Sequence, residues 1–411
     1  MMHRPRIAIF TDTFHEVNGV ALTCRQFAAH AAAKGAPFLR VHPGAHTRTF
    51  REGAQSVCEL AASPLSIRFE ADLCFDLRFL RHKALLRAQL EQFQPDWIHV
   101  TSPGHISILG VILAHELGIP LAASWHTNVH QFGARRLANL LSFLPGGLPA
   151  AAAEHAEFAI LKLITRYYRI ARLLFAPNPE LCQMLTARTG KPVHPMHRGV
   201  DLDLYRPRPE TRSPSGPLTI GYVGRLTPEK NLRLLAALHS ALGLRGIPVR
   251  FLIVGQGSEE AWLRANIPSA ELPGVLRGEA LARAYASMDI FAFPSQTDTY
   301  GNVVQEAKAC GVPVVVTSGG GPKYLVQHGV DGLITSTDAE FVAAIILLAQ
   351  DHSLRSRLAQ AAFSAAQSLS WGAVFTSVYQ AYAGTASTDA HTALRPSPVL
   401  THSGRTPRDA A

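Results

Sequence analysis

Residues 293–306 read Phe-Pro-Ser-Gln-Thr-Asp-Thr-Tyr-Gly-Asn-Val-Val-Gln-Glu and combine a strand end, a glycine-containing loop and the start of a helix. An acid, Asp298, opens the loop, and a second acid, Glu306, follows inside the predicted helix. Backbone N–H groups at such a junction point outward, and the helix dipole attracts anions there. The two carboxylates can accept hydrogen bonds from hydroxyl groups on either side of a bound phosphate. The alternative is a plain helix cap at Asp298 or Thr299, with Glu306 in solvent.

The composition indicates a globular chain of two domains. Its 411 residues exceed one ordinary core, and 47% hydrophobic against 17% charged residues excludes a disordered protein. No apolar run approaches the roughly 20 residues of a membrane span, and residues 6–10 are too short for the apolar region of a signal peptide. The cysteines at positions 24, 58, 74, 182 and 310 have neither metal nor redox spacing, which predicts free thiols in a reducing cytosol.

The chain is basic, with a formal net charge of +9 and a pI of about 9.5. This balance suits nucleic acid, anionic lipid or phosphorylated small molecules as partners. The sequence contains no helix-turn-helix, zinc-finger or aromatic RNA-binding pattern, so we expect no nucleic-acid partner.

Short apolar runs alternate with helical patterns in both halves of the chain. The predicted strands are residues 6–10, 37–42, 97–101, 121–125, 218–223, 249–254, 290–294 and 312–317. This alternation predicts an α/β fold with parallel sheets and helices on both faces, in which ligands bind at the carboxyl ends of the strands. A Pro/Ser-rich linker at residues 206–217 separates the halves, and the Ser/Thr/Pro-rich residues 385–411 are predicted to be a disordered tail.

Further polar segments follow the predicted strands. Gly19 lies in the loop after the first strand, where glycine permits close backbone approach to a phosphate. Arg225 and Lys230 are predicted at the start of a helix, where their charges oppose the helix dipole unless an anion binds. His126 ends a strand, and Arg198 precedes the linker in a turn. Each has a plainer interpretation, as a turn, a solvated cation or a structural histidine.

Taken together, the ordered motifs resemble glycosyltransferase family 4. They are residues 10–20 (Phe-Thr-Asp-Thr-Phe-His-Glu-Val-Asn-Gly-Val), Arg-Gly-Val-Asp at 198–201, Val-Gly-Arg-Leu at 223–226, Glu-Lys-Asn-Leu at 229–232 and Thr-Asp-Thr-Tyr-Gly-Asn-Val-Val-Gln-Glu-Ala at 297–307. The resemblance covers roughly residues 5–384 and is strongest to the branch of GDP-mannose-dependent mannosyltransferases and plant-type sulfolipid synthases.

The resemblance implies the GT-B architecture, two facing Rossmann-like domains with a cleft between them. Residues 1–205 would form the acceptor domain and residues 218–367 the donor domain, while a final helix at 368–384 crosses back to the first domain. The implied donor-binding residues come from both domains: Gly19, Arg225, Lys230, Asp298, Tyr300, Gly301, Asn302 and Glu306.

The same resemblance implies a role for each side chain. Arg225 and Lys230 would neutralise the diphosphate of a nucleoside-diphosphate sugar, and Glu306 would bind the ribose hydroxyls. Asp298 would bind a sugar hydroxyl, assisted by the backbone N–H groups of residues 300–302, and His126 would face the donor sugar and the acceptor. The implied catalytic residues are thus His126, Arg225, Lys230 and Asp298. The family commonly has Glu at the position of Asp298, so the reach of this carboxylate to the sugar differs.

The resemblance implies hexosyl transfer, of mannose or another hexose from GDP-mannose or a UDP-sugar, with retention of anomeric configuration. Two cations can stabilise the leaving group by electrostatics, and no Asp-x-Asp metal signature lies at a fitting place, so we expect neither metal nor cofactor. Alternatives are a non-catalytic nucleotide-sugar or membrane-binding protein and, disfavoured by the absence of Gly-x-Gly-x-x-Gly after the first strand, a Rossmann-type oxidoreductase.

The acceptor is expected to be a lipid or glycan. Residues 131–174 carry six cations among apolar side chains, namely Arg135, Arg136, Lys162, Arg166, Arg169 and Arg172. Such a segment can lie on an anionic membrane, or it can form packed helices with solvated basic edges. We expect a cytoplasmic protein. In the membrane interpretation of the basic segment, the protein also makes peripheral contact with the inner face of the cell membrane.

Overall fold

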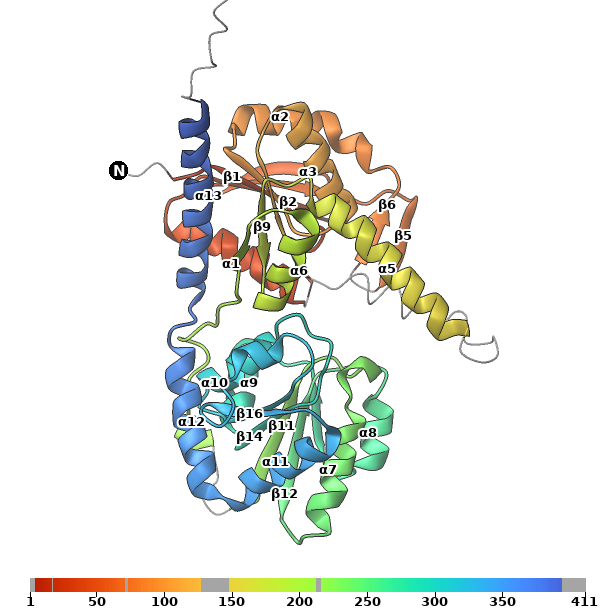
Figure 1. The fold of residues 1–411 in the computed structure, drawn as a ribbon, viewed down its shortest axis with the longest axis vertical. Helices are drawn as coiled ribbons and strands as arrows, with labels where there is room; N and C mark the ends of the chain where they lie inside the picture. The colour runs from red at the N-terminus through yellow and green to blue at the C-terminus, as the bar shows by residue number, and fades with distance from the viewer. Residues whose placement is uncertain (1–3, 17, 71–72, 127–147, 212–215, 394–411) are drawn as a thin grey trace, which may run out of the picture.

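The computed structural model describes residues 4–16, 18–70, 73–126, 148–211 and 216–393. These residues form two large sheets, one in each half of the chain, and each sheet lies between helices (Figure 1). The predicted α/β fold with two Rossmann-like halves is confirmed. None of the helices in the described part has the length and apolar run that crossing a membrane would require.

The N-terminal sheet is parallel except at one edge. In spatial order its strands are β10 (Val193–Pro195), β9 (Leu173–Ala176), β8 (Leu121–Ser124), β7 (Trp97–Val100), β1 (Ile7–Phe10), β2 (Phe38–Pro43), β4 (Gln55–Leu60) and β3 (Arg48–Glu52). Only β3 pairs antiparallel, with β4. All four strands predicted in this half are present. The strands β3, β4, β9 and β10 were not predicted, and the residues of β3 are polar and mostly exposed.

The helices of this half connect its parallel strands. They are α1 (Gly19–Ala33), the 3-10 helix η1 (Phe79–His82), α2 (Lys83–Phe93), α3 (His105–Glu116), α5 (Leu148–Tyr168) and α6 (Pro179–Thr189). A separate hairpin is formed by β5 (Ser66–Glu70) and β6 (Leu73–Asp76). In Figure 1, α5 projects outward from the sheet at its N-terminal end.

The C-terminal sheet is parallel throughout. In spatial order its strands are β13 (Glu271–Gly274), β12 (Val249–Val254), β11 (Leu218–Val223), β14 (Ile290–Phe293), β15 (Val314–Thr317) and β16 (Gly332–Thr335). The surrounding helices are α7 (Arg233–Gly243), α8 (Glu260–Asn266), α9 (Gly278–Ala286), α10 (Asn302–Ala309), α11 (Asp338–Gln350) and α12 (His352–Ala366), with 3-10 helices η2 (Pro209–Thr211), η3 (Pro228–Lys230) and η4 (Pro322–Leu325). All four strands predicted in this half are present.

Both faces of the N-terminal sheet are buried. Ala8 and Phe10 of β1 belong to the core on one face, whereas Ile7 and Ile9 belong to the core on the other. Because successive strand residues point to opposite faces, the strand reads as a continuous apolar run. This explains why the central strands could be recognised from the sequence.

The last helix, α13 (Trp371–Ala393), leaves the C-terminal half and runs along the N-terminal one (Figure 1). Its buried residues recur at helical spacing and enter the core that also holds Phe27 of α1: Trp371, Phe375, Val378 and Tyr382. Phe375 stacks on Phe27 with ring centroids 4.6 Å apart. The helix continues nine residues past the predicted start of the disordered tail, since neither Gly nor Pro occurs at residues 385–393. Residues 394–411 lie outside the described residues.

The chain passes between the two halves twice, and the two passages lie side by side. Val200 forms a parallel bridge with Ser370, and the N–H of Val200 donates to the carbonyl of Leu369 at 2.8 Å. A β-carbon at position 199 would lie 2.4 Å from the backbone nitrogen of Trp371, so only glycine fits there. This contact fixes how the carboxyl edges of the two sheets meet.

We predict that Phe375→Ala destabilises the protein by about 3–5 kcal/mol, because it removes a buried aromatic ring and leaves a cavity against Phe27. Urea unfolding followed by tryptophan fluorescence measures the loss. Gln380→Ala, on the exposed side of the same helix, is the control and should change stability by less than about 0.5 kcal/mol. Equal midpoints for the two variants would contradict the packing of α13 described above.

Candidate functional site

The acidic loop between β14 and α10 is held by a lysine from a different loop. Lys230 Nζ, from the segment after β11, lies 2.8 Å from each oxygen of Asp298. Ser295 Oγ donates to Asp298 Oδ2 at 2.5 Å. The Lys230 side chain is only 9% exposed and that of Asp298 is 25% exposed. The pair therefore presents a fixed cation and a fixed carboxylate next to each other, as a charged ligand with hydroxyl groups requires.

Two helices begin at the same place, one from each half of the chain. α1 begins at Gly19, behind its cap Asn18, and α10 begins at Asn302, behind Gly301. A β-carbon at position 19 would lie 3.6 Å from Nδ2 of Asn302. Neither first turn contains an acidic residue. Because each helix N-terminus presents N–H groups and the positive end of a dipole, their junction favours an anion.

Gly301 is required at the start of α10 for a conformational reason. Its φ of 95° lies in the left-handed region, which side chains with a β-carbon rarely adopt. A β-carbon there would also approach Cγ of Pro322 to 3.0 Å. The glycine therefore turns the chain so that the N–H groups of the first turn of α10 face the junction.

Arg225 lies two residues after β11 and is not ion-paired to the acidic loop. Its Nη2 is 3.7 Å from Oε1 of Glu229, and its side chain is 53% exposed. The prediction that Arg225 and Lys230 start the next helix is wrong in detail. Pro228 begins a 3-10 turn that ends at Asn231, whose φ of 55° is left-handed, and α7 begins only at Arg233. The two cations are thus on a loop with its own turn.

Glu306 lies one turn into α10 and is half-buried. Tyr285 of α9 donates its hydroxyl hydrogen to Glu306 Oε2 at 2.7 Å. Burial raises the pKa of the Glu306 carboxyl to about 7, although the Tyr285 hydrogen bond opposes the shift. Near neutral pH this group therefore changes between a hydrogen-bond donor and a pure acceptor.

The acidic loop is tied to the N-terminal half by three hydrogen bonds. Thr299 Oγ1 donates to the carbonyl of His126 at 2.9 Å, and Asn178 Nδ2 donates to the carbonyl of Thr299 at 2.7 Å. The Tyr300 hydroxyl donates to the carbonyl of Arg198 at 3.1 Å. The side chains of Thr299 and Tyr300 therefore lock the loop across the two halves, a role that the sequence analysis did not assign to them.

His126 is buried at the centre of a chain of hydrogen bonds. Arg198 Nη2 donates to His126 Nδ1, so the proton of the neutral ring is on Nε2, which donates to Ser124 Oγ at 2.5 Å. Ser124 Oγ then donates to His99 Nε2 at 2.8 Å, and His99 Nδ1–H donates to the Tyr382 hydroxyl oxygen of α13. Burial, and then the charge of Arg198, hold the pKa of His126 well below its usual value. Both ring nitrogens of His126 thus bond within the protein.

One polar residue after a strand has a structural use. Asp12, directly beyond β1, accepts hydrogen bonds from the backbone N–H of Ile106 at 2.8 Å and from Ser107 Oγ at 2.7 Å. Ser102 Oγ also donates to it, at 2.6 Å. The carboxylate therefore caps the start of α3 and is unavailable to a ligand.

The structure brings the residues expected at the site into one region. Lys230 contacts Asp298, Gly19 approaches Asn302, and His126 contacts the loop through its backbone carbonyl. Sequence reasoning missed Ser295, whose contact with Asp298 is local, and it missed Thr299, Asn178 and Tyr285, whose contacts join segments that no local pattern relates. The assigned roles of the predicted site residues stay predictions.

Comparison with known proteins gives matches over both halves. A model described as Glycosyltransferase Family 4 matches residues 17–204, and one described as Glycosyl transferases group 1 matches residues 217–351. A GDP-mannose-dependent alpha-mannosyltransferase of Mycobacterium tuberculosis (strain CDC 1551 / Oshkosh) is 31% identical over 350 residues, covering 80% of this chain and 83% of that protein. The sulfoquinovosyl transferase SQD2 of Arabidopsis thaliana is 27% identical over 311 residues, covering 71% of this chain and 57% of that protein.

Solved structures share the fold. Sucrose-phosphate synthase from Thermosynechococcus elongatus superposes with a TM-score of 0.72 at 18% identity, covering 94% of this chain and 100% of that chain. Anabaena HepE in complex with UDP and glucose superposes with a TM-score of 0.62 at 20% identity, covering 93% of this chain and 100% of that chain.

We predict that the histidines of the hydrogen-bonded chain make the fold sensitive to acid. Burial lowers the pKa of His99 to about 3, below its unfolded value near 6.5, so the unfolded chain binds the extra proton first. The contribution of His99 to the free energy of unfolding is fully present above pH 6.5 and is lost as the pH falls from 6.5 towards 3. Between pH 7 and pH 5, His99 alone should remove about 2 kcal/mol.

Urea unfolding at pH 7 and pH 5 measures this loss. His99→Gln should flatten the pH dependence, whatever its effect on stability at pH 7. The exposed His115 gives the control variant His115→Gln, which should keep the wild-type slope. An unchanged slope in His99→Gln would show that His99 is not held neutral.

Proposed function

The chain belongs to glycosyltransferase family 4, and we propose that this enzyme transfers a hexose, with mannose as the first candidate, from a nucleoside-diphosphate sugar to a lipid or glycan acceptor. The observation that carries the proposal is the meeting of two helix N-termini at Gly19 and Asn302, beside the Lys230–Asp298 pair. Mannose is favoured because relatives named GDP-mannose-dependent alpha-mannosyltransferase align over most of the chain.

The donor diphosphate would lie at the helix junction. There the N–H groups of both first turns and the charges of Lys230 and Arg225 converge on its oxygens. Glu306, four residues after Asn302 on α10, would accept hydrogen bonds from the ribose hydroxyls. Arg225 is exposed and only loosely paired with Glu229, so it can turn towards the phosphates at little cost.

Asp298 has two tasks in this proposal. It accepts a hydroxyl hydrogen of the donor sugar, and it holds Lys230 in position over the diphosphate. Ser295 and Lys230 both bond to this carboxylate, which limits its movement. The side chain is one methylene shorter than the Glu common in the family, so the sugar must approach the loop more closely.

We propose retention of anomeric configuration by attack on the face from which the diphosphate leaves. The acceptor hydroxyl transfers its proton to a phosphate oxygen of the leaving group, and the new glycosidic bond forms as the old C–O bond breaks. Lys230 and Arg225 stabilise the negative charge that develops on the diphosphate. Electrostatic stabilisation of this type is usually the largest single contribution of an active site to the rate. This route requires neither a metal nor a protein nucleophile.

His126 would act in this scheme as a positioning residue. Its ring nitrogens bond to Arg198 and Ser124, and its carbonyl receives Thr299 from the acidic loop. The neutral ring can lie against the donor sugar and the acceptor without exchanging protons with either.

The acceptor would approach from the side of α5. Three cations of this region, Lys162, Arg166 and Arg169, line a groove together with Arg188 of α6. Phe158, Leu163 and Ile170 are large apolar side chains that are exposed nearby. Cations among exposed apolar groups suit an anionic lipid surface, which supports a lipid acceptor at the inner face of the membrane. Residues 131–147 of the basic segment lie outside the described residues.

A donor-by-acceptor screen tests the proposal. GDP-mannose, UDP-glucose and other sugar nucleotides are combined with lipid and glycan acceptors, with and without anionic vesicles. Release of nucleoside diphosphate and the product mass are measured, and NMR of the product gives its anomeric configuration. No turnover with any sugar nucleotide would remove the proposal, and an inverted product would remove the front-face mechanism.

We predict that Lys230→Ala and Arg225→Ala each lower turnover by about 100-fold or more, because each removes charge stabilisation from the transition state. Turnover is measured as nucleoside diphosphate released in the steady state. Arg245→Ala, on an exposed arginine after α7, is the matched control. Turnover near wild type in both site variants would show that these cations do not contact the leaving group.

We also predict that Glu306 and Asp298 affect different parts of the donor. Glu306→Gln should weaken binding of the free nucleoside diphosphate. Asp298→Asn keeps one oxygen that accepts from Lys230, so it should spare this binding and lose turnover. Since the pKa of Glu306 is about 7 and the carboxylate form accepts the ribose hydroxyls, wild-type affinity should fall about tenfold from pH 8 to pH 6. Glu306→Gln should remove this pH dependence. Calorimetry with the nucleoside diphosphate alone measures the affinity of each variant. Weakened binding in Asp298→Asn together with unchanged binding in Glu306→Gln would exchange the roles assigned to the two acids.

A further inference from the structure

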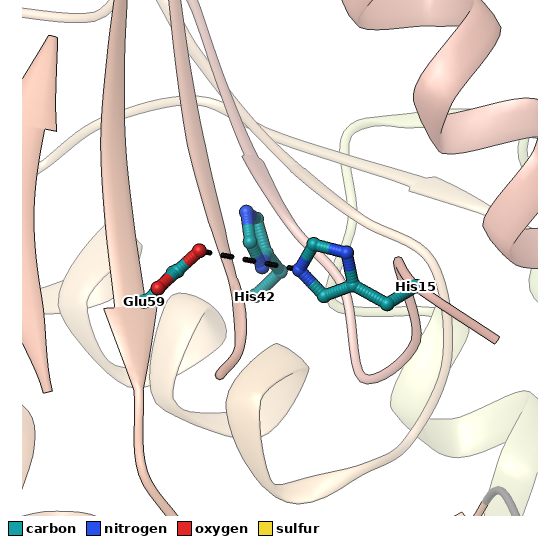
Figure 2. Close-up of side chains that lie close together, drawn as sticks. All are labelled: His15, His42 and Glu59. Atoms are coloured by element: carbon teal, nitrogen blue, oxygen red, sulfur yellow. Dashed lines mark ion pairs between the residues drawn. The ribbon is translucent and has the colours of Figure 1, made fainter. Parts of the chain in front are cut away.

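A cluster of two histidines and one glutamate lies in the N-terminal half, outside the residues assigned to the donor. His15 follows β1, His42 is on β2 and Glu59 is on β4. Figure 2 shows the three side chains pointing towards one another. Their potential ligand atoms all lie within 4.8 Å of one another.

The two strand residues are fixed by the sheet. His42 and Glu59 are direct partners in the parallel register of β2 and β4. His42 is fully buried, and the Glu59 side chain is only 10% exposed. A β-carbon at position 44 would lie 2.7 Å from Cβ of Glu59, so a glycine at this position leaves the room that the Glu59 side chain occupies.

His42 has one ring nitrogen in use and one without a partner. Its Nδ1–H donates to the carbonyl of Pro43 at 2.9 Å, which leaves the lone pair on Nε2. Nε2 is buried, and no polar atom of the described residues lies within hydrogen-bonding distance of it. The ring also stacks on Phe14 with centroids 4.3 Å apart. A buried, oriented imidazole nitrogen without a partner is costly, and a backbone carbonyl on the other nitrogen is the usual support of a metal-binding histidine.

Glu59 divides its two oxygens between two neighbours. Oε2 accepts from Arg48 Nε at 2.6 Å, whereas Oε1 faces His15 Nε2 at 4.0 Å. His15 is 61% exposed and sits on the loop, so its side chain can move. The other nearby cation is Arg40. Its guanidinium carbon lies 5.1 Å from the centroid of the Phe14 ring, and the guanidinium also forms an ion pair with Glu52. One oxygen of Glu59 and both histidines thus remain for a ligand.

We propose that His15, His42 and Glu59 form a binding site for a divalent transition metal of the Zn²⁺ class. Two imidazole nitrogens and one carboxylate oxygen are a ligand set that Zn²⁺ uses together with one open position. Tetrahedral Zn²⁺ with bonds of about 2.0–2.1 Å spaces its ligand atoms by about 3.3 Å, so pairs of atoms in the cluster must approach each other by up to about 1.5 Å. The exposed side chain of His15 can supply a large part of that movement.

The metal would order the loop that leads to the donor junction. His15 is three residues before Asn18, the cap of α1, and four before Gly19. Binding of His15 to a metal held by two buried strand residues would fix this loop against β2 and β4. The open coordination position can take water. Metal binding is measured directly and without a sugar donor, so its result is independent of the transferase function.

The test is titration of the chelator-treated full chain with Co²⁺, whose visible absorption reports tetrahedral coordination, and with Zn²⁺ by calorimetry. We expect one metal ion per chain and a higher unfolding temperature with metal. His15→Ala should weaken binding by at least about tenfold and lose the Co²⁺ absorption. Since His15 is exposed, this variant is expected to fold, which circular dichroism checks; His42→Ala should lose the same signal.

Matched variants separate a true site from adventitious binding. Glu59→Gln and Arg48→Gln both break the Arg48–Glu59 ion pair, but only Glu59→Gln removes the ligand carboxylate. Metal binding should therefore be lost in Glu59→Gln and kept in Arg48→Gln, and His115→Ala should bind as wild type does. Wild-type affinity in His15→Ala, or absence of the Co²⁺ absorption from the wild-type protein, would overturn the proposal.

Discussion

The site depends on one backbone contact, the pairing of Val200 with Ser370. Val200 lies where the chain first passes between the two halves, and Ser370 lies where it passes back. A single connection would leave the two sheets free to turn, whereas two paired connections and a helix packed on the far half restrict that rotation. With the carboxyl edges of the sheets held opposite each other, the acidic loop after β14 can reach the carbonyl groups of His126 and Arg198. The alignment of the two halves is therefore set by backbone and packing, and the polar contacts of the site add to it.

Charge in this region is held in place before any ligand arrives. Lys230 is largely buried and paired with Asp298, and Arg198 is buried against His126. Burial lowers the pKa of Arg198 to about 10, which still leaves it charged at neutral pH. Removing a cation from water is costly, and the protein offsets that cost with short hydrogen bonds to groups that are themselves fixed. An anion that bound here would require little reorganisation of these cations, which is the property that the proposed stabilisation of a leaving group needs.

The sequence indicated eight of the strands because each reads as a short apolar run, and it predicted a site from the polar residues that follow them. Strands buried on both faces read as apolar runs, and polar residues that follow them gather at one edge. The polar edge strand β3 gives no such signal, and the start of α7 was misplaced because Pro228 and Asn231 form a separate turn. The contacts that complete the site join distant positions. His99 and Tyr382 are 283 residues apart, and Tyr285 meets Glu306 across two helices.

The same reasoning explains why His15, His42 and Glu59 were invisible in the sequence. Metal sites are recognised from sequence when their ligands follow a fixed spacing on one element, and these three residues come from a loop and two strands. What relates them is the register of β2 against β4, which places His42 beside Glu59 and which a one-residue shift would destroy. The rule that parallel strands gather functional side chains at their carboxyl ends thus applies twice in this half of the chain. It places Gly19 at the junction of the two helix N-termini and His15, four residues earlier, at the cluster with the strand residues.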